Sequence, residues 1–187
     1  IRWNGTSWST VASPTGQNLN SVFMVSANDG WAVGVKSGNQ PTMLRWNYTC
    51  DGAIQNNQWN DCTVDVAPLT NQDLNSVFMV SSTDGWAVGR RTGATTDGWV
   101  LLRWNNPTAN AWNRYSTVNP ATVAKDLSSV YCISSRECHA TGVSGMILNW
   151  NGSQWNVPPS PSEADLNSVY LIGTTTPSGQ WEEIFPP

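Results

Sequence analysis

The chain has 187 residues, of which 12% are Asp, Glu, Lys or Arg, and 12 residues are tryptophan. Its net charge of −4 and the lack of a basic stretch argue against nucleic-acid binding, because phosphate backbones are held by clustered Lys and Arg. No apolar run approaches the roughly 20 residues of a transmembrane helix, so we expect no membrane insertion within this segment. The 15 glycines and 11 prolines, without long helical windows, favour an all-β fold of short strands.

One stretch of sequence recurs along the chain. Residues 19–26, Leu-Asn-Ser-Val-Phe-Met-Val-Ser, return unchanged at 74–81, altered at 127–134 and in part at 166–170. The first two copies are followed by Asp-Gly-Trp-Ala-Val-Gly, then by Leu-Arg-Trp-Asn and a further tryptophan. Because the sequence begins in the middle of this pattern and carries no signal peptide, we expect a processed or partial product. The recurring segments divide the single domain into three full repeats (19–73, 74–126 and 127–165) and two half-repeats (1–18 and 166–187).

Each full repeat predicts four short strands. In the first repeat these are residues 21–25, 31–34 and 44–46, and a fourth strand around Trp59. The Asp-Gly between the first two strands is typical of a tight hairpin. The repeats start 55, 53 and 39 residues apart, which is the size of a β-propeller blade. Large tryptophan side chains suit the wedge between blades, so we expect those of the second and third strands to pack there.

Counting strands predicts a β-propeller of four antiparallel, four-stranded blades. Residues 1–18 supply the last two strands of one blade, and residues 166–187 supply a first strand and a second near 180–182. We expect these N-terminal and C-terminal strands to share one blade and close the ring. Two alternatives stay open: the chain is part of a propeller with more blades, or the halves complete one another between molecules.

The pairing of Gly-Trp-Ala-Val-Gly with Arg-Trp-Asn-Gly-Thr-Ser-Trp resembles the extracellular WAVG/WNGTSW-repeat proteins of bacteria and archaea. These are related in pattern to BNR, Ycf48-like and kelch-type β-propellers. The resemblance covers nearly the whole chain and implies a propeller fold. It implies little about activity, since propellers include enzymes, lectins, scaffolds and adhesins. Because Trp31 directly follows Gly30, the Asp-box order of sialidases is not met.

Four cysteines predict two local disulfides, the alternative being four reduced thiols. Cys132 and Cys138 lie opposite each other across the predicted hairpin of the third repeat. Cys50 and Cys62 bracket an insertion in the first repeat. A zinc site needs closer clustering of ligands, and the chain has one histidine, so we expect no metal. Two local disulfides favour an oxidising setting, extracellular or at the cell surface.

Three sequons are glycosylation candidates. They begin at Asn4, Asn47 and Asn151 and share one repeat position. We expect that position to be an exposed turn, where a glycan attaches in a host with the required enzymes.

The sequence predicts no catalytic residue and no cofactor. The lone histidine, His139, stands where the first two repeats have tryptophan, so we interpret it as a packing residue. Asp73, Asp126 and Asp165 each precede a first strand, and we expect them to accept hydrogen bonds from backbone amides. The third strands carry a recurring arginine, which we expect between blades or in solvent; it is Arg2, Arg45 and Arg103.

The sequence favours a non-enzymatic extracellular structural or adhesive module: a surface or filament subunit, or an adhesin. Its partners would be further copies of itself or other surface proteins. The alternative is a carbohydrate-binding, lectin-like propeller whose aromatic side chains stack on glycans. Trp99, Tyr48 and Tyr115 lie outside the repeat and are the candidates for this role. A lectin would have these side chains exposed and clustered on one face.

Overall fold

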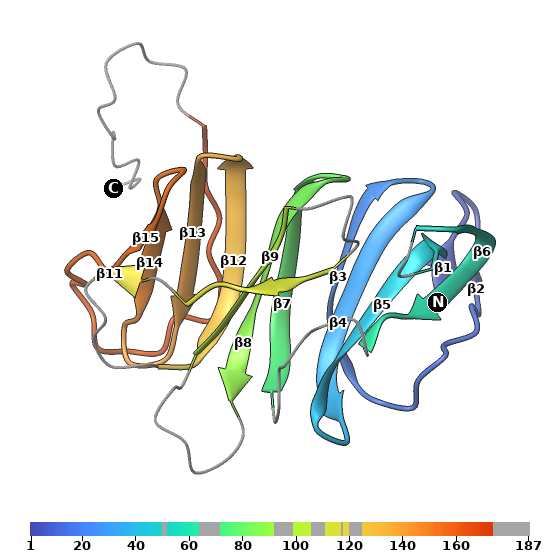
Figure 1. The fold of residues 1–187 in the computed structure, drawn as a ribbon, viewed down its shortest axis with the longest axis horizontal. Helices are drawn as coiled ribbons and strands as arrows, with labels where there is room; N and C mark the ends of the chain where they lie inside the picture. Colours follow the sequence, from blue (N-terminus) through green and yellow to red (C-terminus); the bar gives the residue numbers. More distant parts are fainter. Residues whose placement is uncertain are drawn as a thin grey trace.

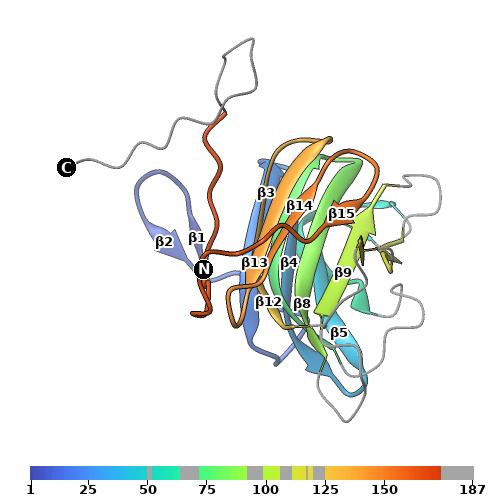
Figure 2. The same ribbon diagram turned by 90° about the vertical axis from the view of Figure 1, so that its left-hand side faces the viewer.

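The computed structural model describes residues 1–49, 52–63, 72–91, 99–105, 111–116, 118–119 and 125–173. Its elements are all β-strands, which confirms the all-β class. Three sheets of four or five strands stand face to face in a row, and a two-stranded hairpin lies at one end (Figure 1). Figure 2 looks along this row, with the sheets one behind another.

Each of the three sheets contains one copy of the recurring segment, and we call them blades 1 to 3. Their strands are antiparallel and adjacent in chain order. Blade 1 comprises β3 (Leu19–Ser26), β4 (Asp29–Ser37), β5 (Gln40–Tyr48) and β6 (Ile54–Asp61). Blade 2 comprises β7 (Gln72–Ser81), β8 (Asp84–Arg91), β9 (Trp99–Trp104) and β10 (Asn113–Arg114). Blade 3 comprises β12 (Leu127–Ser134), β13 (Glu137–Gly142), β14 (Ile147–Trp150) and β15 (Trp155–Asn156).

Blade 3 also has a strand that the sequence did not predict. Strand β11 (Val118–Asn119) comes from the connection after blade 2 and pairs in parallel with β15. Two residues without a repeat match give no strand pattern, so only the neighbouring edge of β15 defines this strand.

A glycine in the second strand of each blade lets the backbone at the start of the first strand come close to it. A Cβ atom at Gly34 would collide with the carbonyl oxygen of Asn18, the residue that precedes β3. Gly89 approaches Asp73 in the same way, and Gly142 approaches Asp126. The first two strands of each blade therefore need glycine at this point.

The same kind of hydrogen bond joins the first strand of each blade to the first strand of the next, from β3 to β7 and from β7 to β12. The Ser21 hydroxyl accepts a hydrogen bond from the Val77 N–H at 3.2 Å. The Ser76 hydroxyl does the same for the Val130 N–H at 3.3 Å. A ladder of aromatic rings runs beside these bonds, with centroids 4.6, 4.7 and 4.6 Å apart; its members are Phe23, Phe78, Tyr131 and Tyr170.

The two halves of the predicted fourth blade are both recognisable, but the described structure keeps them apart. The N-terminal half forms the hairpin of β1 (Arg2–Trp3) and β2 (Trp8–Ser9) beside blade 1. Residues 166–173 lie at the blade 3 end of the row (Figure 1). There the Val169 N–H donates to the Ser129 hydroxyl at 3.3 Å, which repeats the bond between the complete blades.

Residues 166–170 thus take the place of the first strand of a next blade, yet they are not assigned to a strand. A strand needs a hydrogen-bonded neighbour, and none of the described residues pairs with them as a second strand. The predicted second strand near 180–182 lies outside the described residues, so the shared blade and the closed ring stay predictions.

The predicted Cys132–Cys138 disulfide is present and joins β12 to β13. Cys50 lies outside the described residues, so the Cys50–Cys62 pairing stays a prediction. Among the described residues, no helix is long and apolar enough to cross a membrane.

Candidate functional site

The tryptophan of each third strand is fixed by its own blade. The Trp46 indole N–H donates to the Ala27 carbonyl at 3.2 Å, in the turn between the first two strands. Trp104 donates to Ser82, and Trp150 donates to Ser135, each at 3.0 Å. A recurring hydrogen bond therefore orients this ring in all three blades.

The tryptophan of each second strand inserts into the next blade, as the sequence predicted. The Trp31 ring of blade 1 lies 5.0 Å from Trp104 and 5.3 Å from Trp112 of blade 2. The Trp86 ring of blade 2 lies 4.9 Å from Trp150 and 5.0 Å from Trp155 of blade 3. Each junction between blades therefore contains three packed indole rings, and we call it a tryptophan triad.

The recurring arginine of the third strand packs between blades. The Arg45 guanidinium lies 5.1 Å from the Trp31 ring and 5.3 Å from the Trp104 ring of blade 2. Its Nε donates to the turn aspartate Asp29 at 3.3 Å. Arg103 repeats this arrangement with Asp84, also at 3.3 Å. Of the two predicted locations, Arg45 and Arg103 show the first, between blades, whereas Arg2 in the hairpin is exposed.

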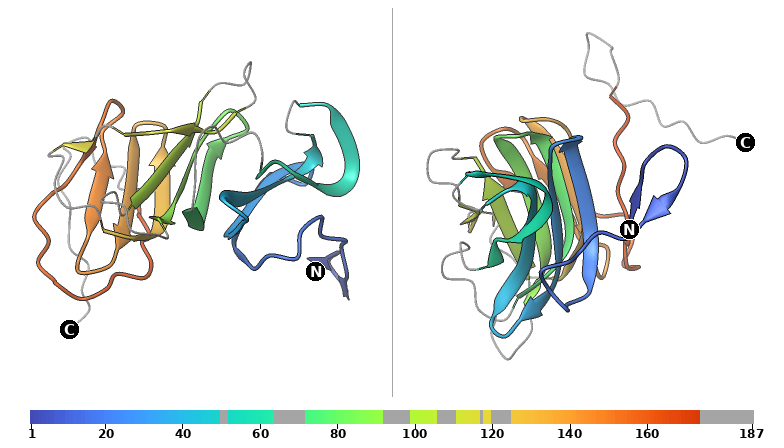
Figure 3. Two further views of the ribbon diagram at one scale, coloured as in Figure 1. Left: turned by 60° about the horizontal axis from the view of Figure 1, so that its bottom comes forward. Right: turned by 90° about the vertical axis from the view of Figure 1, so that its right-hand side faces the viewer.

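Among the described residues, no four-stranded sheet packs on the side of blade 1 that faces away from blade 2. Leu19, Val22 and Met24 are 44%, 61% and 43% exposed there, and we call this surface the open face. The equivalent residues of blade 2 are only 0%, 4% and 2% exposed; they are Leu74, Val77 and Met79. Figure 3 (right) looks onto this end of the row, where no described sheet covers blade 1 and the hairpin lies beside β3.

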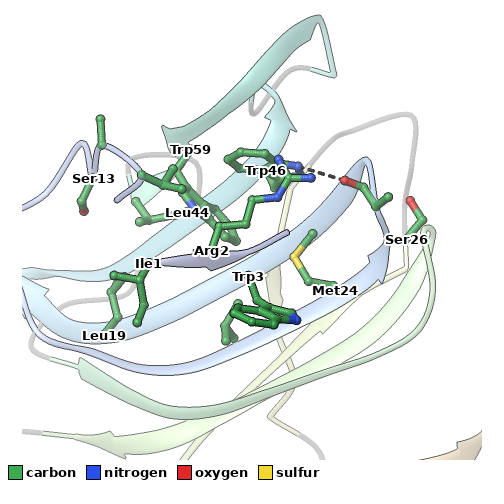
Figure 4. Close-up of a pocket in the computed structure, with 14 residues that line it drawn as sticks. Ile1, Arg2, Trp3, Ser13, Leu19, Met24, Ser26, Leu44, Trp46 and Trp59 are labelled. Carbon is green, nitrogen blue, oxygen red and sulfur yellow. Dashed lines mark hydrogen bonds between the residues drawn. The ribbon is translucent and has the colours of Figure 1, made fainter. Parts of the chain in front are cut away.

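A cavity of about 480 Å³ lies on the open face. Trp46 and Trp59 form its aromatic wall, with ring centroids 5.4 Å apart. The guanidinium of Arg2, from the hairpin, lies 5.3 Å from the Trp46 ring and repeats the stacking of Arg45 on Trp104 (Figure 4). Leu44 and Met24 complete the apolar lining. The cavity therefore lies beside the same pair of rings and the same arginine that occur in the triads, although Trp46 itself is only 4% exposed.

Sequence reasoning did not single out the open face, because residues 19–25 have the same sequence as their buried copies at 74–80.

The aspartates before the first strands fit their predicted role in two cases of three. Asp73 accepts a hydrogen bond from the Lys36 N–H at 3.0 Å, and Asp165 accepts one from the Ser144 N–H at 2.8 Å. Asp126 is partly buried, and burial raises its pKa while nearby Arg90 lowers it. The carboxylates of Asp73 and Asp165 therefore hold the backbone at the entry to these strands.

His139 occupies the predicted tryptophan position. It pairs with Asn149 in the register in which Trp31 pairs with Arg45. It is half-buried, and burial lowers its pKa, while the charge of Glu137 acts in the opposite direction. The far side of blade 3 thus presents His and Asn where the other blades present Trp and Arg.

The predicted glycosylation position is an exposed turn in only two of its three copies. Asn4 and Asn151 are exposed, and the side-chain oxygen of each accepts backbone hydrogen bonds within its turn. Asn47 is only 5% exposed, and its side-chain oxygen accepts the Asn57 N–H. The prediction for Asn47 is therefore wrong, because the insertion that follows folds back over it.

The three aromatic candidates for sugar binding are partly buried rather than exposed. Trp99 and Tyr115 pack against the core between blades 2 and 3, and the Tyr115 hydroxyl donates to the Ser153 carbonyl at 3.1 Å. Burial raises the pKa of Tyr115, while Arg103 opposes this rise. Tyr48 lies on β5 under the guanidinium of Arg45, at 4.7 Å. They do not form the exposed cluster expected of a lectin.

Among the described residues, no three His, Cys, Asp or Glu side chains are grouped closely enough to hold a metal ion.

The fold is a β-propeller built of four-stranded antiparallel blades. The structure of Ycf48 bound to a D1 peptide matches with a TM-score of 0.54 at 16% identity, over 79% of this chain and 43% of that one. Ycf48 from Cyanidioschyzon merolae matches with a TM-score of 0.53 at 17% identity, over 91% of this chain and 48% of that one. This chain therefore spans less than half the length of either. At these identities the likeness shows the fold alone.

No family model and no curated protein sequence matches the chain. The predicted resemblance is therefore supported for the propeller fold, and the relation to extracellular WAVG/WNGTSW-repeat proteins stays a prediction.

Proposed function

We propose that this chain is a non-enzymatic protein-binding propeller module, with a structural or adhesive role outside the cell, and that it binds its partner on the open face of blade 1. The observation that carries the proposal is the contrast in exposure between Leu19, Val22 and Met24 and their buried copies in blade 2. Contiguous apolar surface next to a cavity is typical of an interaction site. That one Ycf48 structure contains a bound peptide supports a protein ligand for this fold.

Two further features support the rest of the proposal. Asp29 and Asp84 are engaged in ion pairs within their blades, and Asp73 and Asp165 accept backbone hydrogen bonds, which leaves all four unsuited to acid–base catalysis. The Cys132–Cys138 disulfide favours an oxidising compartment.

The test is selection of a phage-displayed peptide library on the immobilised chain. We expect enriched peptides whose binding is lost in Val22→Glu, because a carboxylate there would be buried against apolar groups. Ile54→Glu is the matched control, since Ile54 is 67% exposed on the same blade but does not line the cavity. Peptides that bind Val22→Glu and wild type equally, or no enrichment at all, would overturn the proposal. Binding on a glycan array that Val22→Glu leaves intact would favour the lectin instead.

A further inference from the structure

The aromatic ladder beside the first strands changes its chemistry along the row of blades. Its rings in blades 1 and 2 belong to Phe23 and Phe78. The next two rings belong to Tyr131 of blade 3 and to Tyr170 in the segment that follows blade 3. The two phenol groups of the ladder are therefore neighbours, and they lie at the blade 3 end of the row.

Tyr131 and Tyr170 contact each other directly. Their ring centroids lie 4.6 Å apart, and the rings are tilted by 56°. The preceding pair in the ladder, Phe78 and Tyr131, has a similar spacing of 4.7 Å and a tilt of 50°. A side-chain hydrogen bond to Tyr170 raises the pKa of Tyr131, and desolvation adds to that rise. The two phenols are therefore in contact through both their rings and their hydroxyl groups.

The backbone around Tyr170 fixes the position of its ring. The Leu166 N–H donates to the Gly142 carbonyl at 2.9 Å, and the Val169 N–H donates to the Ser129 hydroxyl at 3.3 Å. The second of these hydrogen bonds repeats the one that joins the first strands of complete blades. The contact between the two phenols therefore follows from the repeat, because Tyr170 takes the ladder position of a next first strand.

We propose that Tyr131 and Tyr170 form a site of oxidative crosslinking, at which a peroxidase with hydrogen peroxide joins the two side chains as dityrosine. Tyr170 is 71% exposed, so an oxidant reaches it from solvent, and Tyr131 is partly buried beside it. The other two tyrosines of the chain, Tyr48 and Tyr115, contact arginine or tryptophan side chains instead of a second phenol. The crosslink is therefore specific to one pair.

The reaction balances with hydrogen peroxide as the oxidant. Each phenol loses one electron and its O–H proton and becomes a phenoxyl radical. The two radicals form a carbon–carbon bond between ring positions ortho to the oxygens. The hydrogens at those two carbons then move to the oxygens, which restores both phenols. The two electrons and two protons that were removed reduce one molecule of hydrogen peroxide to two molecules of water.

The crosslink would fasten residues 166–170 to blade 3. These residues take the place of a first strand, but none of the described residues pairs with them as a second strand. A covalent bond between residues 131 and 170 closes a loop of chain and so restricts the unfolded state, as a disulfide does. The neighbouring Cys132 is already in a disulfide, which favours an oxidising compartment. This inference is independent of the open face, which lies at the other end of the row.

The test treats the full chain with a haem peroxidase and hydrogen peroxide and follows the blue fluorescence of dityrosine. We expect at least tenfold less dityrosine in Tyr131→Phe and in Tyr170→Phe than in the wild type. Tyr48→Phe is the matched control and should behave like the wild type. Phenylalanine keeps a ring in the ladder, as Phe78 does in blade 2, so the variants should fold; circular dichroism spectra check this.

Mass spectrometry then locates the new bond. Trypsin cleaves after Arg136, between the two tyrosines, and reduction opens the Cys132–Cys138 disulfide that also joins the two sides. Peptides 126–136 and 137–187 contain one tyrosine each, and we expect them to stay joined with the loss of two hydrogen atoms. Separate peptides, fluorescence that persists in Tyr131→Phe, or dityrosine found only in crosslinked dimers would overturn the inference.

Discussion

Residues 19–26 and 74–81 have the same eight-residue sequence, and both form the first strand of a blade. Their surroundings differ. In blade 2 the side chains of Leu74, Val77 and Met79 are buried by blade 1, whereas the copies in blade 1 are 43–61% exposed. Identical local sequence therefore gives a core in one place and a surface in the other, because in a repeat protein burial comes from the neighbouring repeat.

The first prediction tests the buried junction between blades 2 and 3. Trp86 is fully buried and contacts both Trp150 and Trp155. We expect Trp86→Ala to lower the free energy of unfolding by about 3–5 kcal/mol, through lost contacts and the cavity left behind. Guanidinium unfolding followed by near-ultraviolet circular dichroism measures this. Trp8→Ala is the control, since Trp8 is 64% exposed in the hairpin. Equal losses in the two variants would show that the triads do not hold the blades together.

The second prediction compares the two copies directly. Leu74→Ala should cost about 2–5 kcal/mol, as for a buried leucine, and Leu19→Ala should cost less than about 1 kcal/mol. The leucines differ in burial, at 0% and 44% exposed, while their local sequence is the same. Urea unfolding of both variants under identical conditions gives the difference. If Leu19→Ala is as costly as Leu74→Ala, then the open face is covered in solution.

The third prediction concerns blade 3, where a disulfide replaces repeat residues. Cys132 faces Cys138 across the hairpin, at the register position of Met79 and Gly85 in blade 2. Replacing both cysteines with serine should cost about 2 kcal/mol, the value expected for a loop this short in the chain-entropy model. The double variant Cys132→Met with Cys138→Gly restores the blade 2 pair and should be more stable than the double serine variant. Thermal unfolding ranks the stability of the wild type and the two double variants. An equal loss of stability in both variants would show that the Met–Gly pair cannot take the place of the disulfide.

The fourth prediction compares the effect on stability of replacing Arg103, which lies between two blades, and Arg2, which lies at the open face. Arg103 stacks on Trp86 and Trp150 and pairs with Asp84, so Arg103→Lys loses a planar contact that lysine does not supply. We expect a loss of about 1 kcal/mol in chemical denaturation. Arg2→Lys at the open face should change the stability by less than about 0.5 kcal/mol. A larger effect at Arg2 would mean that the open site is already occupied.

Much of the fold could be predicted from sequence because each repeat encodes its own blade. The hairpin turn and the Cys132–Cys138 pairing are local features, and the structure contains both. The inter-blade placement of Trp31 and Trp86 also followed, since a wedge between sheets needs large apolar side chains.

What sequence reasoning missed depends on segments outside the repeat. The insertion after β5 buries Asn47, while the same sequon at Asn4 stays exposed. The partly buried environment of Tyr115 comes from contacts with Trp150 and Ser153 of blade 3, far along the chain. The open face is a further case, because residues 19–25 carry no mark that distinguishes them from their buried copies.

The last and smallest prediction tests the polar end of the row, where His139 stands in the tryptophan position. Burial lowers the pKa of His139 below its usual value of 6.5, so the unfolded chain takes up a proton at a higher pH than the folded chain does. The stability that His139 contributes is therefore complete above pH 6.5 and decreases as the pH falls toward the lowered pKa. Urea unfolding at several pH values between 8 and 5 should show this decrease, and His139→Gln should reduce it. If the free energy of unfolding depends on pH in His139→Gln as it does in the wild type, then another group is responsible for the decrease. Asp126 is expected to act in the opposite direction at lower pH, because burial raises its pKa above 3.8: its contribution is present below 3.8 and lost as the pH rises through the raised pKa.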